Sequence, residues 1–136
     1  MKISMSLKLY LIVSGLIGAV VGAAILLLPA ALHATNGVDL GESASLLSEI
    51  RAPGGALLAA GIGIVYGAYR PKYATQAAFV SIAFYLSYGV SRLISMGLDG
   101  MLAPGLVAVT ALELTMGLAG IIALRRNAQT KNASDR

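Results

Sequence analysis

The sequence predicts an all-α integral membrane protein, a bundle of four transmembrane helices in a single domain. Of its 136 residues, 57% are hydrophobic and only 12% are charged. An average soluble domain is about 25% charged, so this chain has too few polar residues to cover a water-facing surface. Its apolar residues gather in four runs, each close to the roughly 20 residues that cross a bilayer. Backbone groups in hydrocarbon must bond within their own segment, so each run is expected to be a helix.

The first run covers residues 7–32 and follows a basic start at Lys2 and Lys8. A cleaved signal peptide is the alternative, because residues 31–34 resemble a small-residue cleavage site. The apolar stretch is about twice as long as the core of a signal peptide, and further apolar runs follow it. We therefore expect a retained first span.

The remaining runs are delimited by proline, glycine and basic residues and are expected at residues 52–69, 73–96 and 104–124. Pro53 stands near the start of the second run, where a missing N–H group costs a helix nothing. The four spans form one domain, residues 1–126. Residues 127–136 are expected to be a polar, disordered cytoplasmic tail.

The long connection between the first two runs contains an expected short amphipathic helix. Its apolar residues fall on one side and its polar residues more on the other: Leu46, Leu47 and Ile50 against Ser45, Ser48 and Glu49. We expect this segment to lie on the outer leaflet as an anchor and to turn into the membrane at Pro53. A lid over the bundle is the alternative.

Charge is distributed unevenly between the two ends of the expected bundle, within a net charge of +4. Basic residues cluster near both termini and in the loop at residues 70–72, whereas acidic residues predominate in the loops at residues 34–50 and 97–103. Lys and Arg favour the cytoplasmic side of a membrane. Both termini are therefore expected in the cytoplasm, with the two acidic loops outside.

Small residues recur every fourth position in the first two spans, as expected for helices that pack closely in lipid. The first span carries Ser14, Gly18 and Gly22, and the second carries Gly55, Ala59, Gly63 and Gly67. We expect these two faces to pack on each other. The alternative is that one of them forms a homodimer or contacts a partner in a membrane complex.

The third span carries a polar stripe, because helical spacing places Ser81, Tyr85, Tyr88, Arg92 and Ser95 on one face. Such a stripe is expected to face protein or water rather than lipid. In the fourth span, Glu113 lies near the middle of the hydrocarbon, where a carboxyl group must be paired or protonated. Arg92 is its expected partner, and Glu49 and Arg51 at the outer end of the second span would extend the pair into a network.

These charged groups have three possible roles. They fasten the helices together, or they form a polar pocket that opens outward and receives a ligand or a proton, or their side chains extend from chance positions toward the interface. The sequence alone does not choose between the first two.

Several function classes are disfavoured. Without cysteine the chain has no disulfide, thiol nucleophile or cysteine metal site. His33 is its one histidine and is expected to be an interfacial residue rather than a ligand, so neither a metal nor another cofactor is expected. The basic residues end apolar runs instead of forming one face, which disfavours nucleic acid. We find no activated nucleophile or phosphate loop, so we do not favour an enzyme.

Four motifs point to a known family. Residues 48–55 read SEIRAPGG, residues 88–92 read YGVSR, Asp99 and Gly100 follow in a turn, and Glu113 lies in the last run. With these motifs, and over residues 7–124, the chain resembles a family of small four-helix bacterial membrane proteins, domain of unknown function 4345. The resemblance implies a four-helix fold in the plasma (inner) membrane of a bacterium, and it implies no activity.

The favoured hypothesis is a binding or accessory protein of the membrane. Its site is expected to contain Arg92 and Glu113, completed by Tyr85, Tyr88, Glu49 and Arg51. A lipid, a quinone or another small amphiphile suits such a site. The alternatives are a proton-coupled small transporter that uses Glu113 and a structural partner subunit without a ligand.

Overall fold

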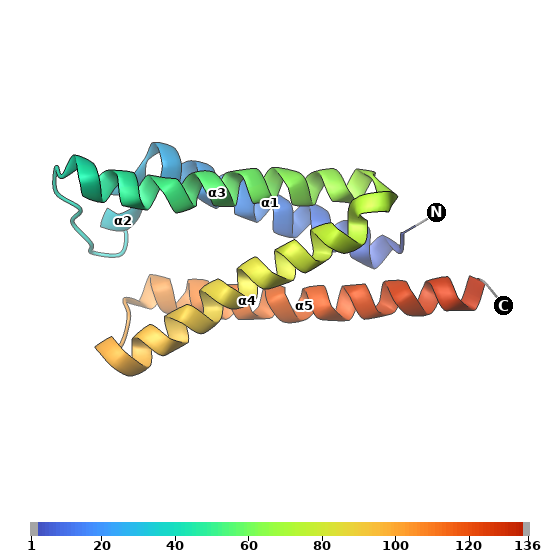
Figure 1. Ribbon diagram of the computed structural model, residues 1–136. Helices are drawn as coiled ribbons and strands as arrows, with labels where there is room; N and C mark the ends of the chain where they lie inside the picture. Colours follow the sequence, from blue (N-terminus) through green and yellow to red (C-terminus); the bar gives the residue numbers. More distant parts are fainter. Residues whose placement is uncertain (1–2, 135–136) are drawn as a thin grey trace.

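The computed structural model describes residues 3–134, and all of its regular structure is helical (Figure 1). Its elements are α1 (Met5–Leu27), α2 (Pro29–Ala34), α3 (Ala44–Tyr69), the single 3₁₀ turn η1 (Pro71–Tyr73), α4 (Ala74–Asp99) and α5 (Pro104–Ser134). The chain has four helical segments that are long and apolar enough to cross a membrane. The all-α class and the four expected long apolar helices are therefore confirmed.

Local chemistry explains where the helices begin and end. Ser4 caps α1 by accepting a hydrogen bond from Leu7 N at 3.3 Å, and Ser43 caps α3 through Leu46 N at 3.4 Å. α1 ends at Leu27 because its C-cap residue Leu28, which precedes a proline, avoids the helical conformation, and Pro29 then begins α2.

The helices form two hairpins, α1 with α3 and α4 with α5. α1 also contacts both helices of the second hairpin, and α4 contacts both helices of the first. Figure 1 shows that the hairpins separate toward the end that carries α2 and the α4–α5 connection, while the described ends of the chain lie together at the opposite end. We call these the loop end and the terminal end.

The buried core lies where the hairpins meet near the terminal end. It is built from small and medium apolar residues around one tyrosine: Leu7, Tyr10, Leu11, Ile64, Ala68, Ala74, Ala77, Ala78 and Ala123. Large apolar side chains cover the outside of the bundle, among them Leu9, Leu16, Val20, Ile62, Phe79, Leu118 and Ile122. An exterior of this kind suits lipid rather than water.

α1 and α3 pack with their backbones in contact, as expected, but α3 uses a different face from the predicted one. A Cβ atom at Gly54 would lie 2.7 Å from Ile25 Cγ2, and one at Gly61 would collide with the backbone of Ala19. On the α1 side, Gly22 likewise meets the backbone of Leu58.

The predicted stripe of α3 was wrong because a four-residue repeat drifts about 40° around a helix at each step, whereas a seven-residue repeat drifts about 20°. Gly54 and Gly61 therefore stay on the side of α1. Ala59 and Gly63 are exposed, and Gly67 instead faces Ala77 of α4.

Two further expectations need correction. The separate interfacial helix is absent from the described residues, because the cap at Ser43 starts α3 early and the helix continues through Pro53 to Tyr69. At the other end, α5 continues past residue 126 to Ser134, where we expected an unstructured tail. No glycine or proline interrupts this stretch, and Asn127 Oδ1 accepts a hydrogen bond from Ser4 N at 2.8 Å. Lys2 and residues 135–136 lie outside the described residues.

Candidate functional site

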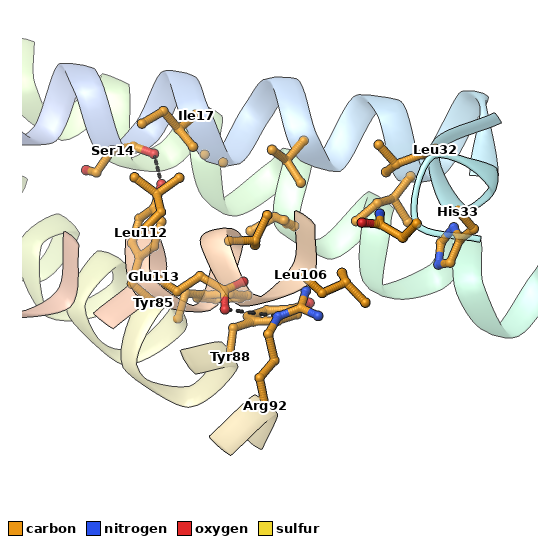
Figure 2. Close-up of a pocket in the computed structure, with 18 of the residues that line it drawn as sticks. Ser14, Ile17, Leu32, His33, Tyr85, Tyr88, Arg92, Leu106, Leu112 and Glu113 are labelled. Atoms are coloured by element: carbon orange, nitrogen blue, oxygen red, sulfur yellow. Dashed lines mark hydrogen bonds and ion pairs between the residues drawn. The ribbon is translucent and has the colours of Figure 1, made fainter. Parts of the chain in front are cut away.

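A cavity of about 330 Å³ lies between the two hairpins on the side of the loop end. It extends from the middle of α1 to α2 and the loop that follows (Figure 2). Four of the six expected site residues line it: Tyr85, Tyr88, Arg92 and Glu113. Most of the remaining wall is apolar, formed by Ile17, Val21, Ile25, Leu32, Val38, Leu57, Ile64, Phe84, Leu106, Val109 and Leu112.

The charged pair at the wall of this cavity is the one predicted from the sequence. Arg92 Nε of α4 donates a hydrogen bond to Glu113 Oε2 of α5 at 3.0 Å (Figure 2). The Glu113 side chain is 11% exposed and that of Arg92 is 29% exposed. The carboxylate is thus enclosed between the helices, while the guanidinium reaches into the open space.

Close helix packing brings these two residues together. One turn before Arg92, Gly89 of α4 lies against α5, and a Cβ atom there would be 2.7 Å from Leu114 Cδ2. One turn after Glu113, Gly117 of α5 makes room for Leu86 in the same way. Because neither glycine has a side chain, α4 and α5 approach closely at this level and the ion pair forms across their interface.

The ion pair uses only part of its hydrogen-bonding capacity. A guanidinium has five N–H donors and a carboxylate accepts at both oxygens. Between residues 3 and 134, no hydrogen bond involves the two terminal nitrogens of Arg92 or the Oε1 atom of Glu113. Among the side chains that the structure describes, no buried nitrogen or oxygen lacks a partner. The unused groups are therefore accessible, and they are available to a ligand.

Hydrogen bonds between α1 and α4 define the inner end of the cavity. Tyr85 Oη donates to the backbone oxygen of Ser14 at 2.7 Å. One turn closer to the terminal end, the hydroxyl groups of Tyr10 and Ser81 share a buried hydrogen bond of 2.8 Å. Tyr88 lies beside the cavity and stacks on Phe84, with 6.4 Å between the ring centroids.

Glu49 and Arg51 do not join the charged pair. Both side chains belong to the exposed beginning of α3, and no ion pair among the described residues involves either one. Arg51 instead borders a shallow groove next to Leu26 and Leu47. The expected network is absent because the hairpins have already separated at this level, which keeps the start of α3 away from α4 and α5 (Figure 1).

Sequence reasoning missed three polar residues that line the cavity: Ser14, His33 and Asn36. His33 Nδ1 lies 2.8 Å from the backbone oxygen of Pro29, which fixes the ring on α2. Pro29 was the available signal, since a break there allows α2 to leave the direction of α1 and place His33 at the wall of the cavity. Without that break, His33 would simply end the first span at the membrane interface.

The fold and the site together define the class of this molecule: an α-helical, multi-pass membrane protein with an ion pair beside a cavity between its helices. Residues 6–124 match the family described as Domain of unknown function (DUF4345), and the chain belongs to that family. No curated protein and no solved structure matches the chain.

Proposed function

We propose that the protein binds a small amphiphile, such as a lipid or a quinone, in the cavity between its hairpins. The observation that carries this proposal is the Arg92 guanidinium, which bonds Glu113 only through Nε and has its terminal nitrogens free beside an apolar space. The volume of about 330 Å³ is at the lower end of the range typical of small-molecule sites.

The geometry of the pair supports binding over simple fastening of the helices. A charge within a membrane helix is costly, and a purely structural Arg–carboxylate pair gains most from two parallel hydrogen bonds. Here one bond holds the pair together while the remaining donors face the cavity. The ligand accepts hydrogen bonds from Arg92, and Tyr88 lies close enough to the cavity to add a hydroxyl group.

The cavity lies toward the loop end, which we assign to the extracytoplasmic side, with both termini in the cytoplasm. Basic residues support this orientation, because Lys8, Arg70 and Lys72 gather near the terminal end, each within 6 Å of a tyrosine ring. Lys and Arg favour the cytoplasmic side and tyrosine favours the interface. A green fluorescent protein fused after α5 is expected to fluoresce, and a dark fusion that is fully translated would contradict the assignment.

Mass spectrometry of the gently purified protein tests the binding function. We expect an amphiphile to copurify with the wild type and to be lost from the double variant Arg92→Gln/Glu113→Gln, which removes both charges together and leaves neither unpaired. Arg51→Gln is the matched control, because it removes an exposed arginine outside the cavity and is expected to keep the ligand. A wild type that retains no amphiphile, or a double variant that retains it equally, would overturn the proposal.

Proton-coupled transport is the second candidate, and Glu113 favours it because its free oxygen belongs to a carboxyl group beside the cavity. In proteoliposomes, Glu113→Gln is expected to abolish any proton-linked flux of a bound amphiphile. Flux that continues unchanged in this variant would remove the transport function and leave binding intact.

A further inference from the structure

We infer that His33 is a second anchor of this cavity, and that the ligand is an uncharged amphiphile with a carbonyl group for Arg92 and a hydroxyl group for His33. The inference rests on the proposed binding function and specifies its ligand class. It follows from three features of the cavity: its charge, the hydrogen bond of the His33 ring, and the positions of the two polar groups.

The charge of the cavity disfavours an anionic ligand. Arg92 and Glu113 are its two charged lining residues in the described chain, and they neutralise each other across a 3.0 Å contact. A carboxylate or phosphate ligand would add a negative charge with no cation left to balance it, in a space whose walls are mostly apolar. A carbonyl oxygen accepts from the free guanidinium nitrogens without that cost.

The His33 ring offers a hydrogen-bond acceptor. Its Nδ1 atom lies 2.8 Å from the backbone oxygen of Pro29. A carbonyl oxygen only accepts, so we assign the proton to Nδ1, and in the neutral ring Nε2 then carries the free lone pair. No hydrogen bond within residues 3–134 uses Nε2. A ligand hydroxyl group is the uncharged partner that such a nitrogen binds.

The two anchors lie on different hairpins and at different depths. His33 comes from α2 at the loop end, whereas Arg92 comes from α4 next to Glu113, and Figure 2 shows Leu106 between them. A ligand that reaches both has polar ends and an apolar middle. Its binding would also connect two hairpins that have separated at this end of the bundle.

Titration of purified protein in detergent with three matched probes tests the inference: methyl decanoate, its ω-hydroxy derivative, and decanoate itself. We expect the hydroxyester to bind about fivefold more tightly than the plain ester, the contribution of one net hydrogen bond. Decanoate is expected to bind more weakly than methyl decanoate because it is charged. Hydroxyesters of shorter and longer chain are titrated in parallel. The chain length that binds most tightly reports the distance between the two anchors.

Two variants assign the hydroxyl preference to His33. His33→Phe keeps a ring and removes Nε2, so the two esters should bind equally. His33→Gln restores an acceptor through its amide oxygen and is expected to recover part of the preference. If His33→Phe does not fold, as judged by circular dichroism and size-exclusion chromatography, the ester comparison in wild type and His33→Gln decides.

The outcomes separate this inference from the proposed function. If wild type binds none of the probes and no hydroxyester of other length, the binding function itself fails. If it binds both esters equally, or if His33→Phe keeps the preference, the cavity remains a binding site but His33 is not an anchor. If decanoate binds more tightly than its methyl ester, the uncharged ligand class is wrong.

Discussion

The Arg92–Glu113 pair makes a quantitative prediction about stability, because its two members are enclosed to different degrees. Removing one partner of a fully buried pair costs about 3–5 kcal/mol, whereas an exposed pair contributes at most about 1 kcal/mol. Glu113 is 11% exposed and Arg92 is 29% exposed. We therefore expect unequal losses from the two single substitutions.

Arg92→Met leaves the more enclosed group unpaired and should lower the free energy of unfolding by about 2–4 kcal/mol. Proton uptake by the carboxyl group limits this cost. Glu113→Leu leaves a guanidinium that already reaches the cavity, so the expected loss is smaller, about 1–2 kcal/mol. The double variant restores neutrality and should be more stable than Arg92→Met alone.

Reversible unfolding in mixed micelles, with increasing sodium dodecyl sulfate, measures the free energy of unfolding of the wild type, the two single variants and the double variant. Glu49→Gln and Arg51→Met supply the control, since both side chains are exposed and unpaired among the described residues; each should change stability by less than about 0.5 kcal/mol. Additive losses in the double variant, or a larger loss from Glu113→Leu than from Arg92→Met, would refute the reasoning.

Four further substitutions test the packing around the site, with Gly63→Ala as the control for Gly61→Ala. Gly61→Ala should destabilise the fold by about 1–3 kcal/mol because its methyl group meets the α1 backbone, whereas Gly63→Ala, with no atom within 4 Å, should be neutral or stabilising; thermal unfolding compares them. Tyr85→Phe removes the hydrogen bond to α1 and should cost about 1 kcal/mol in the same measurement. Gly105→Ala would place its Cβ atom 2.6 Å from Asn36 Oδ1, so hydrogen exchange should become faster in the loop after α2; unchanged exchange would contradict this contact.

The features that the sequence predicts well are those that depend on local composition. The length of an apolar run determines whether it can span a membrane, independently of the helices around it. The four long helices were therefore expected. The ion pair was also predictable, because a carboxyl group in the middle of an apolar helix needs a partner and Arg92 is the charged residue embedded in the adjacent span.

The features that the sequence did not predict depend on how the helices are arranged in space. Glycines occur in α3 at both four-residue and seven-residue spacing, and only the packed bundle shows that Gly54 and Gly61 meet α1. The prediction that Glu49 lies near the ion pair required the helices to stay side by side along their whole length, but the hairpins diverge at that level. His33 reaches the cavity because α2 leaves the direction of α1 after Pro29, a change of direction that hydropathy does not encode.

The tyrosine hydrogen bonds that join α1 to α4 close the inner end of the cavity between these two helices. Tyr85 Oη bonds the backbone oxygen of Ser14 at 2.7 Å, and Tyr10 Oη bonds Ser81 Oγ at 2.8 Å one turn further from the cavity. Both hydrogen bonds join the same two helices. A ligand that enters from the loop end leaves from the same end while both hydrogen bonds are intact. A path between α1 and α4 toward the terminal end therefore requires both hydrogen bonds to break, which under the proposed binding function keeps the ligand on the side of the loop end.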